Sequence, residues 1–118
     1  MITIYGIKNC DTCRKALKWL EAEGHAHKFH DFRSDGLGEK TVRDFIDALG
    51  MEAVLNRRST SWRALDDASK TVLQSEDLDA GVELLVQNPT LIKRPVFDTG
   101  KDMLNGFGPG QIKALSEA

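Results

Sequence analysis

Apolar positions along the chain repeat with two different spacings, and these spacings predict its opening elements. The run 2–5 is apolar and β-branched, as in a short buried strand, and Gly6 interrupts it. From Asp11 the apolar residues recur at i, i+3, i+4 and i+7, which is one face of a helix that Gly24 can end. Aromatic residues over 28–32 predict a second strand. The chain therefore opens as β-α-β.

The middle of the chain has helical spacing. Apolar residues over 42–49 predict a helix that stops at Gly50, and those over 78–85 predict another that ends at the Asn-Pro pair 88–89. The segment 56–63, NRRSTSWR, lies between these helices and is polar and rich in turn-forming residues. The central half is therefore predicted to be mainly helical.

The end of the chain returns to strands. Two apolar pairs, 96–97 and 103–104, flank the sequence DTGKD and predict a hairpin with Gly100 in its turn. Apolar positions after Pro109 predict a closing helix. The second half of the chain thus ends as β-β-α.

The order of these elements predicts an α/β protein with a thioredoxin-like fold and an inserted helical subdomain. We expect one domain of 118 residues, with its core at about 1–32 and 90–118 and the helical insertion at about 33–89. A chain of this length can bury a hydrophobic core without disulfide or metal staples.

Charge and cysteine content narrow the function. The formal net charge of −2 supplies no basic field for nucleic acid or for an anionic membrane. No apolar stretch is long enough to span a bilayer, and the first residues lack the features of a secretory signal. We therefore expect a cytoplasmic monomer that binds neither nucleic acid nor membrane. Two close cysteines in that compartment are catalytic, redox-active or metal-binding rather than a permanent disulfide.

Cys10 is the strongest candidate for chemistry. It lies at the start of the first predicted helix, where unpaired backbone N–H groups and the positive end of the helix dipole favour an anion such as a thiolate. Lys8, Arg14 and Lys15 add positive charge, and Asp11 opposes it. The sum favours an activated sulfur.

Cys13 has two interpretations that the sequence leaves open. The C-x-x-C spacing at a helix start is typical of a redox pair, which makes Cys13 a resolving thiol, yet it also begins the apolar face of the helix and suits the core. With His25 and His30 the two cysteines give C-x2-C-x11-H-x4-H, which is close to a zinc-finger spacing. Because the predicted helix lies between the two pairs, we expect no metal site.

Three segments resemble successive signatures of the arsenate reductase (ArsC) family, and most closely its YffB-like branch: ITIYGIKNCDTCRKAL, LNRRSTSWRAL and LIKRPVFDTGKDMLNGF. The resemblance implies a catalytic cysteine at the end of the first loop and a cis proline that faces it. Residue by residue, Cys10 matches the nucleophile and Arg94 matches the arginine before the cis proline, Pro95. Arg58 matches an arginine of the middle segment. Two guanidinium groups near a thiolate would stabilise it and could hold a carboxylate or oxyanion bidentately.

Two departures from the arsenate reductases bear on the reaction. Those enzymes have a third arginine in the final hairpin region, where this chain has Gly106 or Phe107, and a histidine shortly before the cysteine, where it has Gly6. An arsenate oxyanion would lose a charge-assisted hydrogen bond worth about 1.5–3 kcal/mol. The departures disfavour arsenate reduction.

The resemblance therefore implies a cysteine-dependent thiol reductase that uses glutathione and acts on disulfides or mixed disulfides. Its catalytic residues are Cys10, Arg58 and Arg94, with Cys13 as a resolving thiol. The residues that we expect to bind the co-substrate are Lys8, Asn9, Asp11, Thr12 and Pro95. One alternative is arsenate reductase, and another is a redox-sensing regulator that binds RNA polymerase, because the Spx regulators resemble the same family.

Overall fold

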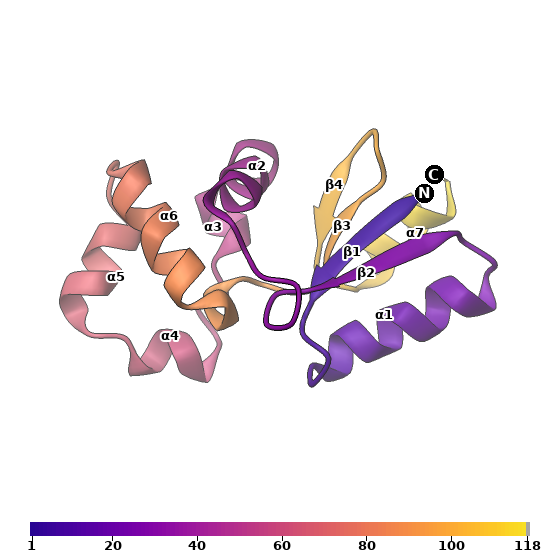
Figure 1. Cartoon of the computed structure of the whole chain (residues 1–118), viewed down its shortest axis with the longest axis horizontal. Helices are drawn as coiled ribbons and strands as arrows, with labels where there is room; N and C mark the ends of the chain where they lie inside the picture. Colours follow the sequence, from indigo (N-terminus) through magenta and orange to yellow (C-terminus); the bar gives the residue numbers. More distant parts are fainter. Residues whose placement is uncertain (118) are drawn as a thin grey trace. The chain divides into compact units, whose positions relative to one another are not determined.

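Four short strands form one mixed sheet in the computed structural model, which describes residues 1–117. The sheet order is β2-β1-β3-β4 (Figure 1). Strand β1 pairs in parallel with β2 and antiparallel with β3, and β3 pairs antiparallel with β4. The bounds are Ile2–Gly6 for β1, His27–Asp31 for β2, Val96–Asp98 for β3 and Met103–Asn105 for β4. Gly100, in the turn between β3 and β4, has a φ of +89°, a backbone conformation that glycine adopts readily.

Helices α1 (Asp11–Ala22) and α7 (Pro109–Ser116) cover the same face of this sheet. Ile4 and Phe97 are register partners on β1 and β3, and both are fully buried. They pack in one cluster with buried residues of the two helices, namely Ala16, Leu20 and Leu115. Helix α1 connects β1 to β2, as the predicted β-α-β opening requires. The mixed α/β, thioredoxin-like fold is confirmed.

The chain divides into two compact units. One comprises residues 1–36 together with the described residues from Arg94 onward, and it holds the sheet. The other is Leu37–Lys93, which is helical. The sequence predicts an insertion at about 33–89, and both of these boundaries fall four residues earlier in the chain than those of the observed helical unit, Leu37–Lys93.

The helical unit consists of short helices around its own core. Their bounds are Glu39–Leu49 for α2, Met51–Val54 for α3, Thr60–Ala64 for α4, Asp67–Leu73 for α5, Leu78–Gln87 for α6 and Pro89–Leu91 for a 3₁₀ turn. Phe45 of α2 and Leu85 of α6 are fully buried in it. Helices α2 and α6 confirm the predictions made from apolar spacing.

Two predicted bounds need correction. The strand expected at 28–32 runs from 27 to 31, because its residues pair in parallel with β1 from Ile2↔His27 to Gly6↔Asp31. The polar segment 56–63 contains the start of α4, which the Ser59 side chain caps by accepting from the Trp62 N–H at 3.1 Å. A helix this short has too few turns for an apolar period to mark it.

Gly6, the last residue of β1, allows the close packing of α1 against the sheet. A Cβ at this position would lie 2.5 Å from the sulfur of Cys13, which real side chains do not tolerate. Cys13 is fully buried and has little room to retreat. The first turn of α1 therefore packs closely against the end of β1 because Gly6 has no side chain.

We expect Gly6→Ala to lower the free energy of unfolding by about 1–3 kcal/mol, because it overpacks the Cys13 site. Urea denaturation measures the change. Gly110→Ala is the matched control, since no atom outside its immediate neighbours lies within 4 Å of the added carbon. Adding Cys13→Ala to the Gly6→Ala protein should recover part of the loss. Wild-type stability of Gly6→Ala would contradict the tight contact.

Candidate active site

The Cys10 sulfur lies at the N-terminal end of α1. Cys10 is the N-cap residue, with extended backbone angles (φ −102°, ψ 120°), and its carbonyl accepts from the Arg14 N–H at 3.0 Å. Its own N–H donates to the Ile7 carbonyl at 3.1 Å, which closes a turn before the helix. Cys10 is half-buried.

Opposing influences act on the ionisation of Cys10. Burial is the largest and raises the pKa, because it removes water from the thiolate. The Cys13 backbone N–H and thiol, and then the Arg94 guanidinium, lower the pKa, and together they outweigh burial. The Cys10 side chain makes no capping hydrogen bond to the helix, so the Cys13 amide acts on the sulfur at longer range than a tight N-cap contact. The net result is a Cys10 pKa below its ordinary value.

Cys13 has the opposite character. Its side chain is fully buried, and burial, followed by the hydrogen bond to Cys10 and the charge of Cys10, raises its pKa to about 12. The Ile7 backbone N–H partly offsets this effect. Both cysteines are free thiols in the structure. Of the two sulfurs, Cys10 therefore ionises more readily, and Cys13 keeps its proton at neutral pH.

Arg94 belongs to the same unit as the cysteines and acts directly on Cys10. Its Nε and Nη1 atoms are buried and have no hydrogen-bond partner among residues 1–117. The Arg94–Pro95 peptide bond is cis, as the family resemblance implied. The Pro95 carbonyl accepts from the Gly106 N–H at 2.9 Å. The Arg94 guanidinium therefore lies close to Cys10 and keeps two buried N–H groups unpaired within residues 1–117.

The loop residues expected to bind a co-substrate differ in their surroundings. Asn9 and Thr12 are exposed, and the exposed Asp11 forms an ion pair with Arg14 at 2.8 Å. Lys8 is exposed, and its backbone N–H and its charge both act on Asp31. Two of the cations expected to favour the Cys10 thiolate therefore have acidic partners of their own.

Arg58 lies in the helical unit, Leu37–Lys93. It is exposed, and its backbone N–H donates to the Asn56 side chain at 3.2 Å. Together with Arg57 and Lys93 it lines a hollow of about 440 Å³. Its role beside Cys10 stays a prediction.

The histidines do not join the cysteines. The His25 ring stacks on Trp19 with 5.3 Å between ring centroids, and the His30 Nε2 atom hydrogen-bonds the Gly36 carbonyl at 2.7 Å. Within the described part of the chain, no group of three or more His, Cys, Asp or Glu residues is arranged to hold a metal ion.

The two positions that depart from the arsenate reductases have structural roles. Gly6 leaves the space that the Cys13 sulfur fills. The Phe107 ring packs against Phe97 and Trp19, at centroid distances of 6.2 and 6.0 Å. Neither position supplies a charged or hydrogen-bonding side chain to the site.

One polar residue near the site was not predicted from the sequence. Asp31 is only 4% exposed and accepts the Lys8 N–H at 3.0 Å. The sequence marked it only as part of a strand. One feature of the sequence could have indicated a role for Asp31. It is an acidic residue at the end of a predicted strand, and that strand is the neighbour of the strand that leads to Cys10.

The sheet order, with a C-x-x-C pair at the start of its first helix, defines a protein of thioredoxin-like fold. The chain belongs to the ArsC family, whose model matches residues 5–115. This family includes arsenate reductases.

Individual relatives span nearly the whole chain. An uncharacterized protein of Haemophilus influenzae is 44% identical over 114 residues, which cover 97% of each chain. The solved structure of the YffB (PA3664) protein has a TM-score of 0.86 and 38% identity, with 97% of each chain covered. The regulatory protein MgsR of Bacillus subtilis is 30% identical over 98% of this chain and 90% of its own length. The chain is also similar to Spx global transcriptional regulators. Over residues 1–117, none of the helices has the length and apolar character needed to cross a membrane.

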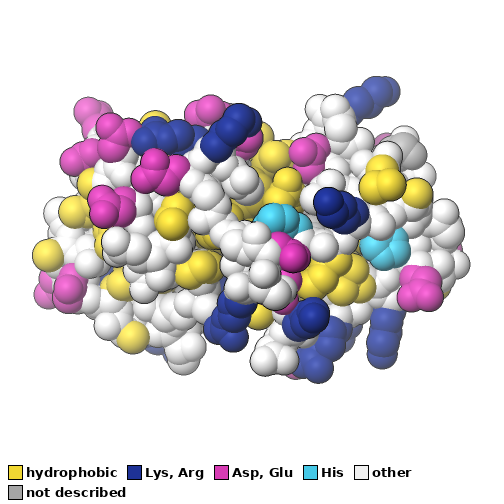
Figure 2. All heavy atoms as spheres, viewed as in Figure 1, with side chains coloured by type: hydrophobic (Ala, Val, Ile, Leu, Met, Phe, Trp, Pro, Cys, Tyr) yellow, Lys and Arg dark blue, Asp and Glu magenta, His cyan; other side chains and the backbone are white. Residues whose placement is uncertain are grey.

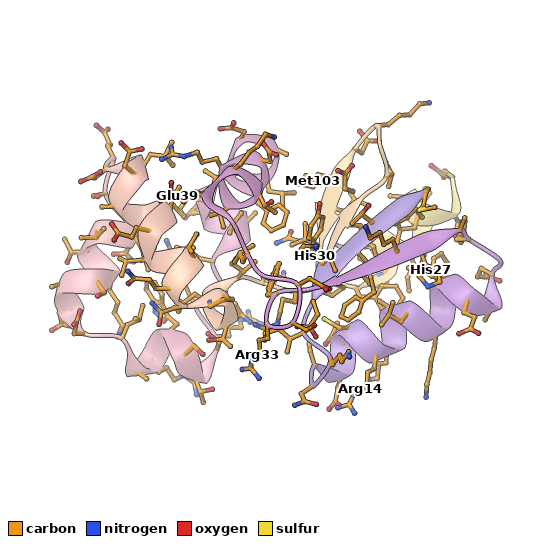
Figure 3. The ribbon with its side chains drawn as sticks, in the orientation of Figure 1. Arg14, His27, His30, Arg33, Glu39 and Met103 are labelled. Atoms are coloured by element: carbon orange, nitrogen blue, oxygen red, sulfur yellow. The ribbon has the colours of Figure 1, made fainter. Side chains whose placement is uncertain are left out.

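We expect Arg94→Met to raise the Cys10 pKa by about one to two units, because it removes a cation whose hydrogen bond to a charged group is worth about 1.5–3 kcal/mol. Thiolate absorbance near 240 nm, followed against pH, measures the shift. Arg14→Met is the matched control, since Arg14 pairs with Asp11 on the exposed side of α1 (Figure 3). Equal titration curves for the wild type and Arg94→Met would show that Arg94 does not support the thiolate.

Proposed function

We propose that this protein is a cysteine-dependent thiol reductase that acts on disulfides or glutathione mixed disulfides. The observation that carries the proposal is the asymmetric sulfur pair: a half-buried Cys10 with a lowered pKa beside a buried, protonated Cys13. A thiolate is the attacking species in thiol–disulfide exchange, and a neighbouring thiol can complete the reaction. Free thiols of this kind suit a reducing cytoplasm.

The reaction begins when the Cys10 thiolate attacks one sulfur of the substrate disulfide. A bond forms between the two sulfurs, and the other substrate sulfur leaves as a thiolate that takes a proton from water. Cys10 then carries no charge, so one cause of the raised Cys13 pKa disappears. The Cys13 sulfur then attacks the Cys10 sulfur and breaks its bond to the bound thiol, which leaves a Cys10–Cys13 disulfide. The Cys13 proton passes to the released thiolate, which departs as a thiol. Two molecules of glutathione reduce this disulfide and become one molecule of oxidised glutathione.

Glutathione is proposed because its carboxylates match the positive groups near Cys10. The Arg94 guanidinium acts on Cys10, and a guanidinium binds a carboxylate well. Its Nε and Nη1 atoms are buried, so a carboxylate reaches them only after the side chains around them move. Arg14, Lys15 and Lys18, together with the acidic Asp11, line a hollow of about 310 Å³ on α1. Figure 2 shows dark-blue Lys and Arg side chains over the start of this helix. We propose that Arg58 supplies a second guanidinium.

A redox-sensing regulator is the second candidate. The similarity to MgsR and to Spx regulators favours it, because a reversible Cys10–Cys13 disulfide would serve a sensor as well as a reductase. Co-purification with RNA polymerase from an extract tests this candidate directly. Arsenate reduction has less support, since Gly6 and Phe107 are occupied in packing. Arsenate-dependent oxidation of glutathione measures it.

The decisive experiment compares the wild type with Cys10→Ser in the reduction of a glutathione mixed disulfide. We expect the variant to lose at least about a hundredfold in rate, since serine is not a nucleophile at neutral pH without a base. Coupled oxidation of glutathione measures the rate. The Gly110→Ala protein is a folding and handling control. Wild-type turnover by Cys10→Ser would rule out the proposed nucleophile.

We expect Cys13→Ser to accumulate a stable adduct of one glutathione after exposure to oxidised glutathione, because the resolving thiol is gone. Intact-protein mass spectrometry identifies the adduct by its mass. The wild type should instead show a loss of two hydrogens, which corresponds to the internal disulfide. If both proteins keep the adduct equally, Cys13 is a core residue and a second glutathione resolves the intermediate.

A further inference from the structure

Asp31 is a buried charge that the proposed reaction does not use. It is 4% exposed and is the last residue of β2, where it pairs with Gly6, the last residue of β1. A carboxylate rarely stays in such a place unless its oxygens are fully hydrogen-bonded, because leaving water is costly for a charge. The partners of its two oxygens therefore indicate what it does.

Both carboxylate oxygens accept hydrogen bonds from backbone amides. Oδ1 accepts from the N–H groups of Arg33 and Ser34, at 2.7 and 3.2 Å, in the turn after β2. Oδ2 accepts from the N–H of Lys8 at 3.0 Å, and Lys8 precedes Asp31 by 23 positions in the chain. Figure 3 labels Arg33 in the turn after β2. The carboxylate thus joins that turn to the loop that leads to Cys10.

That loop has few other anchors. The Gly6 carbonyl accepts from the Phe32 N–H at 2.8 Å, where the loop begins. The Cys10 N–H donates to the Ile7 carbonyl at 3.1 Å, which makes residues 7–10 a turn with Lys8 at its second position. The hydrogen bond to Asp31 fixes the orientation of the Lys8 amide, which is at that second position. It thereby fixes the orientation of the turn and the position of Cys10 at its end.

We propose that Asp31 is a positioning residue: its carboxylate holds the 7–10 turn so that the Cys10 sulfur meets the Cys13 amide and the Arg94 guanidinium. The proposal rests on the proposed function, because the position of the sulfur matters only if the thiolate reacts. Asp31 itself does not touch the sulfur in this role. It acts through the Lys8 amide.

The charge state of Asp31 agrees with this role. Burial raises its pKa, but the amides of Arg33, Lys8 and Ser34, with the Lys8 charge, lower it further, so that the net pKa lies below the ordinary value. A folded-state pKa below the unfolded value gives stability that is present above the unfolded pKa and is lost as the pH falls through the folded pKa. Asp35, whose Oδ2 accepts the Asp31 N–H at 2.9 Å, is the nearby acid that faces it. The carboxylate is therefore ionised wherever Cys10 reacts as a thiolate.

Asp31→Asn tests the proposal without changing the size of the side chain. An asparagine has one accepting oxygen, and if that oxygen stays with Arg33 and Ser34, its NH₂ group faces the Lys8 N–H and cannot accept from it. We expect the Cys10 pKa to rise and the alkylation rate by iodoacetamide near pH 6 to fall about three- to tenfold, since one pKa unit is tenfold in thiolate. A pure charge effect has the opposite sign, because removing a negative charge lowers a thiol pKa. A lowered or unchanged Cys10 pKa in the variant would overturn the proposal.

Asp35→Asn is the matched control. It also changes an aspartate that hydrogen-bonds β2, but it leaves the Lys8 amide bond in place. We expect its Cys10 pKa and alkylation rate to equal those of the wild type. A pKa rise as large as that of Asp31→Asn would show that any disturbance at the end of β2 has this effect, and would also overturn the proposal.

A second pair of variants tests the same hydrogen bond from its donor side if Asp31→Asn does not fold. Lys8→Pro removes the donated N–H, and proline suits the second position of a turn. Lys8→Ala removes the same charge but keeps the N–H, so it is the reference. The proposal requires a higher Cys10 pKa in Lys8→Pro than in Lys8→Ala, and equal values contradict it. Alkylation needs no disulfide substrate, so these results stand whether or not the protein reduces mixed disulfides.

Discussion

The site depends on the balance of influences on the Cys10 pKa, and burial, the largest of them, opposes ionisation. Burial alone would keep Cys10 protonated. The Cys13 backbone N–H, the Cys13 thiol and the Arg94 guanidinium reverse that tendency together. Each of these groups comes from a different structural device: a helix start, a buried side chain and the residue before a cis proline. If any one of these groups moves away from the sulfur, the effect of burial is offset less and the Cys10 pKa rises.

The same balance gives the two cysteines an order of action. Cys13 keeps its proton because it is more deeply buried and because a neighbouring thiolate repels a second negative charge. Once Cys10 is bonded to another sulfur, that repulsion is absent, while the Ile7 amide remains to favour the Cys13 thiolate. In the proposed reaction Cys10 therefore acts before Cys13, and this order needs no conformational change. The asymmetry follows from where β1 ends and where α1 begins.

Much of the fold follows from the sequence because apolar spacing is a local signal. The long helices α1, α2 and α6 and the hairpin at Gly100 each show it within their own residues. The five-residue helix α4 does not, since a capping serine and not an apolar face starts it. The register of β2 depends on β1, which lies outside its own segment. The sequence predicted that Cys10 lies at the start of a helix because the helical spacing begins directly after it. The hydrogen bond between Asp31 and Lys8 joins residues 23 positions apart, and no local pattern predicts it.

Arg94 separates two uses of the cysteine pair. A sensor that only opens and closes its own disulfide needs no anionic ligand beside it, and a buried N–H without a partner costs about 1–3 kcal/mol. Two such nitrogens on one guanidinium are therefore hard to explain as structure alone. An arsenate oxyanion could accept from them, but Gly6 and Phe107 provide it with no further donor. The Nε and Nη1 hydrogens point along different edges of the guanidinium, so these two atoms donate to two separate acceptors and not to one carboxylate in parallel. These unpaired donors beside Cys10 therefore support the proposed reductase over a sensor that needs no ligand.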